Sequence, residues 1–455
     1  MSILGGIISC HAPILIPEIG KGECGKAEKT IEGLKKAFHL AGKLEPETVI
    51  LVSPHMEGYL DAFKIEGGEK GRGDFSRFSF PDVKVGPYSY DLELAKKIQE
   101  EAGKEGIAAS LEEDEEGDFG QDHGSMVPLY FLDHSFYRSY KLVRISVSGL
   151  SYPSHYRMGI AIRKAVDALD RKVLILSSGD LSHCQKEDGP YGYKSCGPLY
   201  DSRIMKTLAG CDFKELLSYD KEAVRKAEVC GHPSFCVLAG CFDGYGVKAT
   251  AYSHEAPFGI GYGVLSFLRE DKQDERCFLG TEKKEETKDP YVSLARRTIE
   301  SYIGENKILS SSGLIDEMVN RKAGAFVSIK EDNELRGCIG TISPFRKNLG
   351  EEIIANAISA STRDPRFSPI RKNELPFLKI SVDVLSPLES VQDKTFLDPK
   401  KYGVVVKSGD RRGLLLPDLE GVDTVEEQIS IALKKAGILE EEPYELFRFT
   451  VERHR

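Results

Sequence analysis

The sequence lacks several features that would assign it to a broad class at once. None of its apolar runs approaches the roughly 18 residues that a membrane-spanning helix needs, so we expect no membrane segment. The first residues, MSILGGIISCHAP, contain no basic region before the apolar stretch and are therefore not interpreted as a signal peptide. No internal repeat has a fixed period, and tryptophan is absent, which by itself excludes nothing.

Positive charge is also scarce. The 455 residues include 62 Lys and Arg against 72 Asp and Glu, a net charge of -10, which argues against nucleic acid and anionic membranes as partners. The ten cysteines form no CxxC pair, a usage typical of reduced thiols, and we expect a cytoplasmic location. A hydrophobic content of 40% and a charged content of 29% are those of a globular protein, and the oligomeric state stays open, a homo-oligomer included.

One charged segment divides the chain. Residues 271–288 belong to a stretch that is mostly Asp, Glu, Lys and Arg and has too few apolar residues to fold alone. A chain of this length also exceeds one ordinary hydrophobic core. We therefore predict a first domain over 1–270, a linker over 271–288 and a second domain over 289–455.

The first domain alternates short apolar runs with helical patterns. The runs are rich in Ile, Val and Leu throughout, which is typical of strands buried on both faces of a parallel or mixed sheet. This order predicts an α/β domain whose sheet is flanked by helices. The expected strands are 3–9, 48–53, 141–147 and 172–178, with a closing strand pair in 247–268, and the expected helices are 26–41, 91–106 and 155–169.

The second domain mixes its elements differently. Helices are expected over 292–304, 348–362 and 425–437, a hairpin over 324–342 and a strand over 378–386. This order predicts an α+β domain.

Histidines follow three of the expected strands in the first domain. His11 follows the first strand and His55 the second, while Asp180 and His183 follow strand 172–178. Because ligands of open α/β sheets lie outside the carboxyl ends of the strands, we expect these side chains to converge. His123, which we place with Asp122 on a glycine-flanked turn in QDHG, can join them.

Several imidazoles at one point are tolerable when they are neutral and bind a metal. Two histidines and a carboxylate suit non-haem iron(II), and zinc also accepts a cysteine. The stretch KAEVCGHPSF offers Glu228, Cys230 and His232 as the third ligand. The alternative is that each histidine has a turn or capping role; we interpret His39, His134 and His155 as structural, assign His454 to the tail and leave His254 open.

Four short motifs carry a resemblance to a known family: HAP at 11–13, SPH at 53–55, QDHGSMVPL at 121–129 and SSGDLSH at 177–183. Together they resemble the class III extradiol dioxygenases, typified by the catalytic subunit of protocatechuate 4,5-dioxygenase, and the related Memo proteins. The resemblance covers about residues 1–268.

That resemblance implies roles for individual residues. His11 and His55 match the two iron-binding histidines, and His183 matches the histidine that acts as acid and base beside the metal. His123 matches a histidine that contacts substrate or oxygen, and Asp180 would orient groups near His183. A small aromatic substrate and O2 are the implied reactants.

The third ligand departs from the ring-cleaving pattern. Ring-cleaving members supply a Glu, whereas Memo-like relatives have a Cys before a Gly. Residues 227–235, AEVCGHPSF, resemble the Memo version, so Cys230 is the first choice and Glu228 the second. A thiolate makes zinc or copper plausible beside iron(II).

The second domain resembles the AMMECR family through ELRGCIGTISP at 334–344, the segment at 361–375 and LKISVDVLSPLE at 378–389. One interpretation places Arg336 and Cys338 in a groove with Arg363, Asp364 and Arg366 nearby. The other, which we favour for Cys338, is a packed hairpin whose glycines serve the backbone. The domain has no histidine except His454, which disfavours a Cys-His pair.

Three functions are compatible with these features. The first is an iron(II) dioxygenase that opens a catecholic or aminophenolic ring. The second is a metal protein without oxygenase activity that acts with a radical-SAM partner, since both resembled families are associated with such proteins. The third is a zinc hydrolase, for which the sequence offers no phosphate-binding loop or oxyanion signature.

Overall fold

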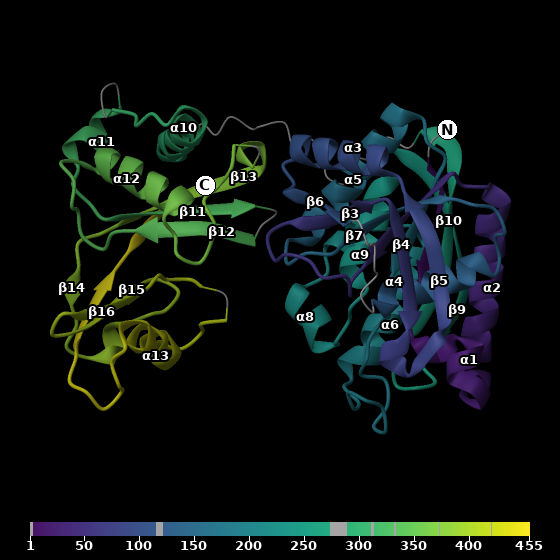
Figure 1. Cartoon of the computed structure of the whole chain (residues 1–455). Helices are drawn as coiled ribbons and strands as arrows, with labels where there is room; N and C mark the ends of the chain where they lie inside the picture. Colours follow the sequence, from purple (N-terminus) through teal and green to yellow (C-terminus); the bar gives the residue numbers. More distant parts are fainter. Residues whose placement is uncertain are drawn as a thin grey trace. The chain divides into compact units, whose positions relative to one another are not determined.

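The chain folds into two compact units, residues 1–282 and 283–455 (Figure 1). The computed structural model describes residues 3–114, 122–273, 289–310, 314–331, 334–372, 374–419 and 421–455. Residues 271–273, which the charge pattern assigned to the linker, are the last residues of the strand β10. Residues 274–288 lie outside the described residues.

The first unit is built on a large mixed sheet. Its main path has the strand order β4-β5-β7-β2-β8-β1-β10-β9, and β3 pairs with both β6 and β7. Strands β7, β2, β8 and β1 run parallel, whereas β10 is antiparallel to β1 and to β9. The strands are β1 (Ile3–Ser9), β2 (Thr48–Ser53), β3 (Phe63–Gly68), β4 (Lys70–Phe75), β5 (Phe80–Tyr90), β6 (Ala109–Asp114), β7 (Lys141–Ser146), β8 (Val173–Ser178), β9 (Tyr245–Glu255) and β10 (Tyr262–Gln273).

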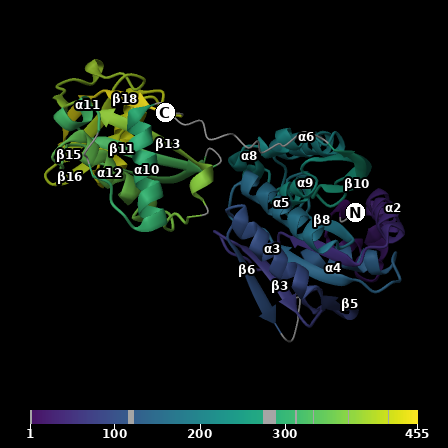
Figure 2. The same ribbon diagram turned by 90° about the horizontal axis from the view of Figure 1, so that it is seen from above.

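Helices cover both faces of this sheet. On one face, α5 lies between α3 and α9 (Figure 2). Ile98, Ile160 and Val237 of these helices share one apolar core with β2, β7 and β8. On the other face, Leu34 of α2 and Met126 of α4 belong to a second core. The helices are α1 (Pro17–Gly20), α2 (Glu28–Leu44), α3 (Leu92–Lys104), α4 (His123–Asp133), α5 (Tyr152–Leu169), α6 (Cys196–Ala209), α7 (Phe213–Leu217), α8 (Lys221–Lys226) and α9 (His232–Cys241).

The apolar pattern was a reliable guide to the central strands. The predicted strands 3–9 and 48–53 coincide with β1 and β2, and 141–147 and 172–178 match β7 and β8 to within one residue at an end. The closing pair is confirmed as β9 and β10. The α/β class is therefore confirmed, with β3 to β6 as strands that the apolar pattern did not indicate.

The second unit combines two small sheets with helices, which confirms the α+β class. Helices α10 and α12 pack on the sheet β12-β11-β13-β18, and α13 packs on the sheet β14-β17-β15-β16. The predicted hairpin is β11 with β12. The elements are α10 (Pro290–Glu305), α11 (Asp316–Asn320), β11 (Ala325–Glu331), β12 (Glu334–Gly340), α12 (Leu349–Thr362), β13 (Leu378–Leu385), β14 (Glu389–Ser390), β15 (Gly403–Ser408), β16 (Arg411–Leu415), α13 (Val425–Ala436), β17 (Glu445–Phe449) and β18 (Val451–His454).

Candidate metal centre

Three histidine-bearing segments leave the sheet at one edge. Strand β8 lies between β1 and β2 and is parallel to both, so the carboxyl ends of all three are neighbours. His11 follows β1 and His55 follows β2, and their Nε2 atoms are 3.0 Å apart. Side chains that are 44 positions apart in sequence thus meet as the strand-end rule predicts.

Cys230 joins these two histidines from the turn between α8 and α9. Its Sγ is 3.6 Å from His11 Nε2. One ligand atom from each of His11, His55 and Cys230 lies within 4.8 Å of the other two. A single ion can contact three atoms at such separations, because metal–nitrogen bonds are about 2.0–2.1 Å and zinc–sulfur bonds about 2.3 Å.

The imidazole of His11 is held in one tautomer. Its Nδ1 lies 2.8 Å from Ser178 Oγ, and the Ser178 hydroxyl donates its own proton to the Gly124 carbonyl. Ser178 therefore accepts from Nδ1–H, which leaves the lone pair of Nε2 directed at the centre. The Gly124 carbonyl is available because Pro128, four residues later in α4, has no N–H to donate to it.

Asp180 contacts His11, although we predicted that it orients groups near His183. One carboxylate oxygen accepts the backbone N–H of His11 at 2.9 Å, and the other lies 3.7 Å from His11 Nε2. The side chain is buried, and this burial raises the pKa of Asp180 to about 7. The carboxyl group thus fixes the loop after β1.

His123 is not on a turn, which corrects the sequence-based expectation. It is the first residue of α4, and the side chain of Asp122 caps the helix by accepting from the N–H of Ser125. The His123 ring stacks on His55 with centroids 4.5 Å apart. A Cβ on Gly124 would lie 2.5 Å from Ser53 Oγ, so the close backbone approach expected of this glycine is present.

A buried ionic network, which sequence reasoning did not find, supports that helix start. Arg144 on β7 is fully buried and donates to Asp122 at 2.9 Å, and it also pairs with Glu66 on β3. Ser53 donates to Asp122 at 3.1 Å and accepts the backbone N–H of His55. The only available signal was an Arg inside the apolar run KLVRISV, which requires buried anions.

His183 has an unused nitrogen. Its Nε2 is buried and has no hydrogen-bond partner among the described residues. Its ring lies 5.0 Å from that of Tyr191, and burial followed by His55 lowers its pKa to about 4. A neutral imidazole with a free nitrogen is suited to exchange a proton with a bound molecule.

The electrostatics of the centre favour neutral ligands. Burial lowers the pKa of His11 and His55, and it lowers the pKa of His123 to about 4. Burial, followed by the Asp180 carboxylate, raises the pKa of the Cys230 thiol well above its ordinary value. A metal that binds here therefore finds unprotonated imidazoles and displaces the thiol proton.

The other two donors of KAEVCGHPSF have different partners. Glu228 forms a half-exposed ion pair with Lys194 at 2.9 Å. His232 is buried, with Nδ1 2.9 Å from the Tyr200 hydroxyl and Nε2 3.1 Å from the Leu216 carbonyl, so both of its nitrogens are engaged. Of the three donors, Cys230 is the one that the structure brings to the two histidines.

The polar residues singled out in the second unit also come together, around β12. Asp364 accepts the backbone N–H of Cys338 at 2.9 Å and pairs with Arg366 at 2.7 Å. Arg336 pairs with Glu374 at 2.8 Å, whereas Arg363 is exposed at the end of α12. The Cys338 thiol lies 3.2 Å from Ser328 Oγ.

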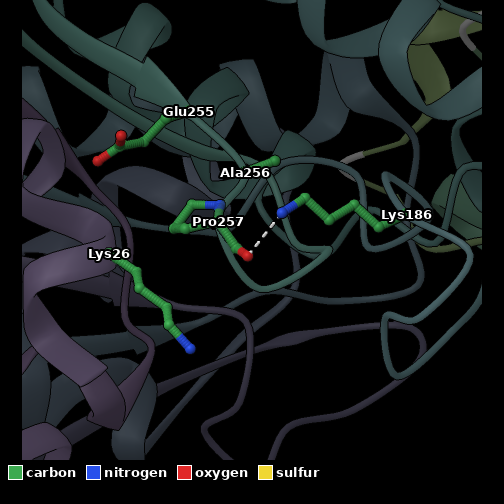
Figure 3. A pocket seen from close by; sticks show the side chains of 5 residues that line it. All are labelled: Lys26, Lys186, Glu255, Ala256 and Pro257. Atoms are coloured by element: carbon green, nitrogen blue, oxygen red, sulfur yellow. Dashed lines mark hydrogen bonds between the residues drawn. The ribbon is translucent and has the colours of Figure 1, made fainter. Parts of the chain in front are cut away.

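A separate open pocket lies elsewhere in the first unit. Lys26, Glu255 and Ala256 line it with Lys186, whose Nζ donates to the Pro257 carbonyl at 2.8 Å (Figure 3). It contains none of the histidines of the metal centre.

The fold and the His-His-Cys cluster define an α/β protein with a candidate metal centre and a second, fused domain. Residues 5–265 match the family described as the catalytic LigB subunit of aromatic ring-opening dioxygenase, and residues 292–454 match AMMECR1. The chain belongs to the LigB family and carries an AMMECR1 domain at its C-terminal end.

Relatives share this organisation or a part of it. Protein CA_C1420 of Clostridium acetobutylicum is 40% identical over 100% of both chains. A Thermotoga maritima protein is 54% identical over 36% of this chain and 97% of its own. Among solved structures, the uncharacterized protein PH0010 of Pyrococcus horikoshii is similar at 32% identity over 36% of this chain and 88% of its own, with a TM-score of 0.34.

Among the described residues, no helix is both long and apolar enough to cross a membrane.

Proposed function

We propose that the first domain is an iron(II) dioxygenase that opens a catecholic or aminophenolic ring, with His11, His55 and Cys230 as the metal ligands. The observation that carries this proposal is the convergence of these three donors beside two further neutral imidazoles, His123 and His183. The donor set leaves positions for a chelating substrate and O2.

Bound iron(II) would supply a Lewis acid that gathers both reactants at one centre. Side chains of the protein would then accept the protons that the substrate releases. The free Nε2 of His183, which burial keeps neutral, would accept the proton that a substrate hydroxyl loses. His123, stacked on His55, presents a second neutral imidazole to the bound reactants.

Metal analysis of protein purified without oxygen tests the site. We expect about one iron per chain in the wild type, and its loss in His55→Ala and Cys230→Ala. His39→Ala, which removes an exposed histidine on α2, is the matched control and retains the metal. Metal retention in Cys230→Ala would remove the thiol from the ligand set.

Oxygen consumption then tests the reaction. Iron-loaded wild type, offered a broad panel of catechols and aminophenols under air, is expected to consume O2 and release a ring-opened product from at least one. His183→Ala is expected to keep its iron and lose most of the turnover. A panel without any ring-opened product would refute the dioxygenase assignment.

One observation favours a second candidate. The third donor is a thiol, and soft thiolate ligands also select zinc and copper. In this alternative the domain binds such a metal without oxygenase activity and serves a radical-SAM partner. Tight zinc or copper with no oxygen uptake would support it.

A further inference from the structure

Hydrogen bonds join the two segments that carry His183 and Cys230. After β8, the backbone N–H of Asp180 donates to Cys230 Sγ at 3.3 Å. Two residues later, Ser182 Oγ donates to the Ala227 carbonyl at 2.7 Å, and its backbone pairs with that of Val229. His183 and Cys230, which flank this pairing, are therefore placed as one unit.

A carboxylate of α6 holds that unit as well, in addition to the two backbone hydrogen bonds that Leu181 and Ser182 form with Gly261. Asp201 is 1% exposed, and one of its oxygens accepts the backbone N–H of Ser182 at 2.9 Å. The other oxygen lies 3.1 Å from His254 Nε2 on β9. Asp201 thus ties the residue before His183 to a helix and to a strand at the same time.

We propose that Asp201 is a positioning residue of the metal centre, which sets His183 and Cys230 through Ser182. This inference rests on the proposed metal site. Without Asp201, the fully buried N–H of Ser182 loses its acceptor, and the segment must move to find another. His11 and His55 follow β1 and β2, and Asp201 forms no hydrogen bond with either; its partners are Ser182 and His254.

Because Asp201 bonds to the Ser182 segment and to neither metal-site histidine, its loss should affect the three proposed ligands unequally. Loss of Asp201 should displace the thiol while the two strand-end histidines still bind a metal. A residue that served only overall stability would change the unfolding temperature without altering the ligands of the metal.

Cobalt(II) reports the ligands directly, because a thiolate bound to cobalt gives an intense charge-transfer band in the near ultraviolet. The full chain is titrated with cobalt(II) without oxygen, with Cys230→Ser as the reference that lacks the band. We expect Asp201→Ala to bind cobalt about tenfold more weakly and to lose at least half of the band per bound ion. Asp201→Asn retains an oxygen acceptor for the Ser182 N–H and should restore the band.

Thr207→Val is the matched control. Thr207 is a buried residue of the same helix whose hydroxyl lies 3.1 Å from that of Tyr219, and it has no role in holding Ser182. This variant should lower the unfolding temperature to a similar extent and keep the full band.

Each outcome decides between the claims. A full band in cobalt-bound Asp201→Ala overturns the positioning role and leaves the metal site intact. A wild type that binds no cobalt overturns the metal site and this inference with it. If Asp201→Ala does not fold, His254→Ala, which removes a partly exposed partner of Asp201, should weaken the band, and an unchanged band then overturns the proposal.

Discussion

The Nδ1–H of His11 donates to the hydroxyl of Ser178, and that hydroxyl donates to the carbonyl that Pro128 leaves free. We predict that Ser178→Ala weakens zinc or iron(II) binding about 10–100-fold, because His11 loses the group that fixes its tautomer. Competition with a chelator measures the affinity. The control is Ser177→Ala, whose buried hydroxyl has no partner among the described residues; equal weakening in both variants would contradict the prediction.

Arg144 is expected to be essential for the stability of the first domain. Arg144→Met removes the cation between Asp122 and Glu66, and we predict a loss of about 3–5 kcal/mol in the free energy of unfolding. Urea unfolding of the full chain measures it. Arg225→Met, which breaks an exposed pair with Glu222, should lower the free energy of unfolding far less, because water screens that pair. Similar costs in the two variants would show that the buried network is dispensable.

His155 should make stability depend on pH. It is buried and neutral, with Nδ1 bonded to the Ser151 carbonyl and Nε2 accepting the N–H of Ser148, and burial lowers its pKa from 6.5 to about 4. The unfolded chain therefore binds the proton more readily, and this histidine costs stability as pH falls from about 6.5 to about 4. The full effect is about 3 kcal/mol.

The comparison with His155→Asn isolates that effect. In metal-free protein, the free energy of unfolding of the wild type should fall more steeply with decreasing pH over this range than that of the variant. Above pH 7 the two curves should run parallel. Identical slopes at low pH would show that the ring is protonated in the folded protein.

In the second domain, substitution of Gly337 should lower the stability more than substitution of the neighbouring Cys338. A Cβ on Gly337 would lie 2.2 Å from the Ala360 carbonyl, so β12 packs directly against α12 at this point. We predict that Gly337→Ala costs about 2 kcal/mol, whereas Cys338→Ala, which removes a contact with Ser328, costs about 1 kcal/mol. Hydrogen exchange of the amides in β11 and β12 measures the loss of stability in each variant. A larger loss in Cys338→Ala than in Gly337→Ala would contradict the prediction.

Sequence patterns predicted the centre of the first domain because one physical constraint dominates there. Strands such as β1 and β8 are buried on both faces, so each is a continuous apolar run, and the histidines that end them mark the same sheet edge. Strands β3 and β5 lie nearer the edge of the sheet and are partly exposed, so polar residues and glycines interrupt their pattern.

Site residues could be predicted from the sequence only where the residue type itself is a common metal ligand. His11, His55 and Cys230 are such residues, but the roles of Ser178, Asp201 and Arg144 depend on partners from distant segments. His123 was misplaced because the glycines around it suggested a turn, whereas Asp122 begins a helix there by capping it.

The separation of the metal ligands along the chain has a consequence for biosynthesis. His11 and Cys230 are 219 positions apart, and β8, which joins the strands that precede the two histidines, is synthesised after both histidines. The nascent chain offers the complete proposed donor set only after Cys230 has been synthesised, which is late in the first unit. Metal acquisition at the proposed site would therefore be a late event in the synthesis of the first domain, and an ion captured earlier by one of the donors would find the others only afterwards.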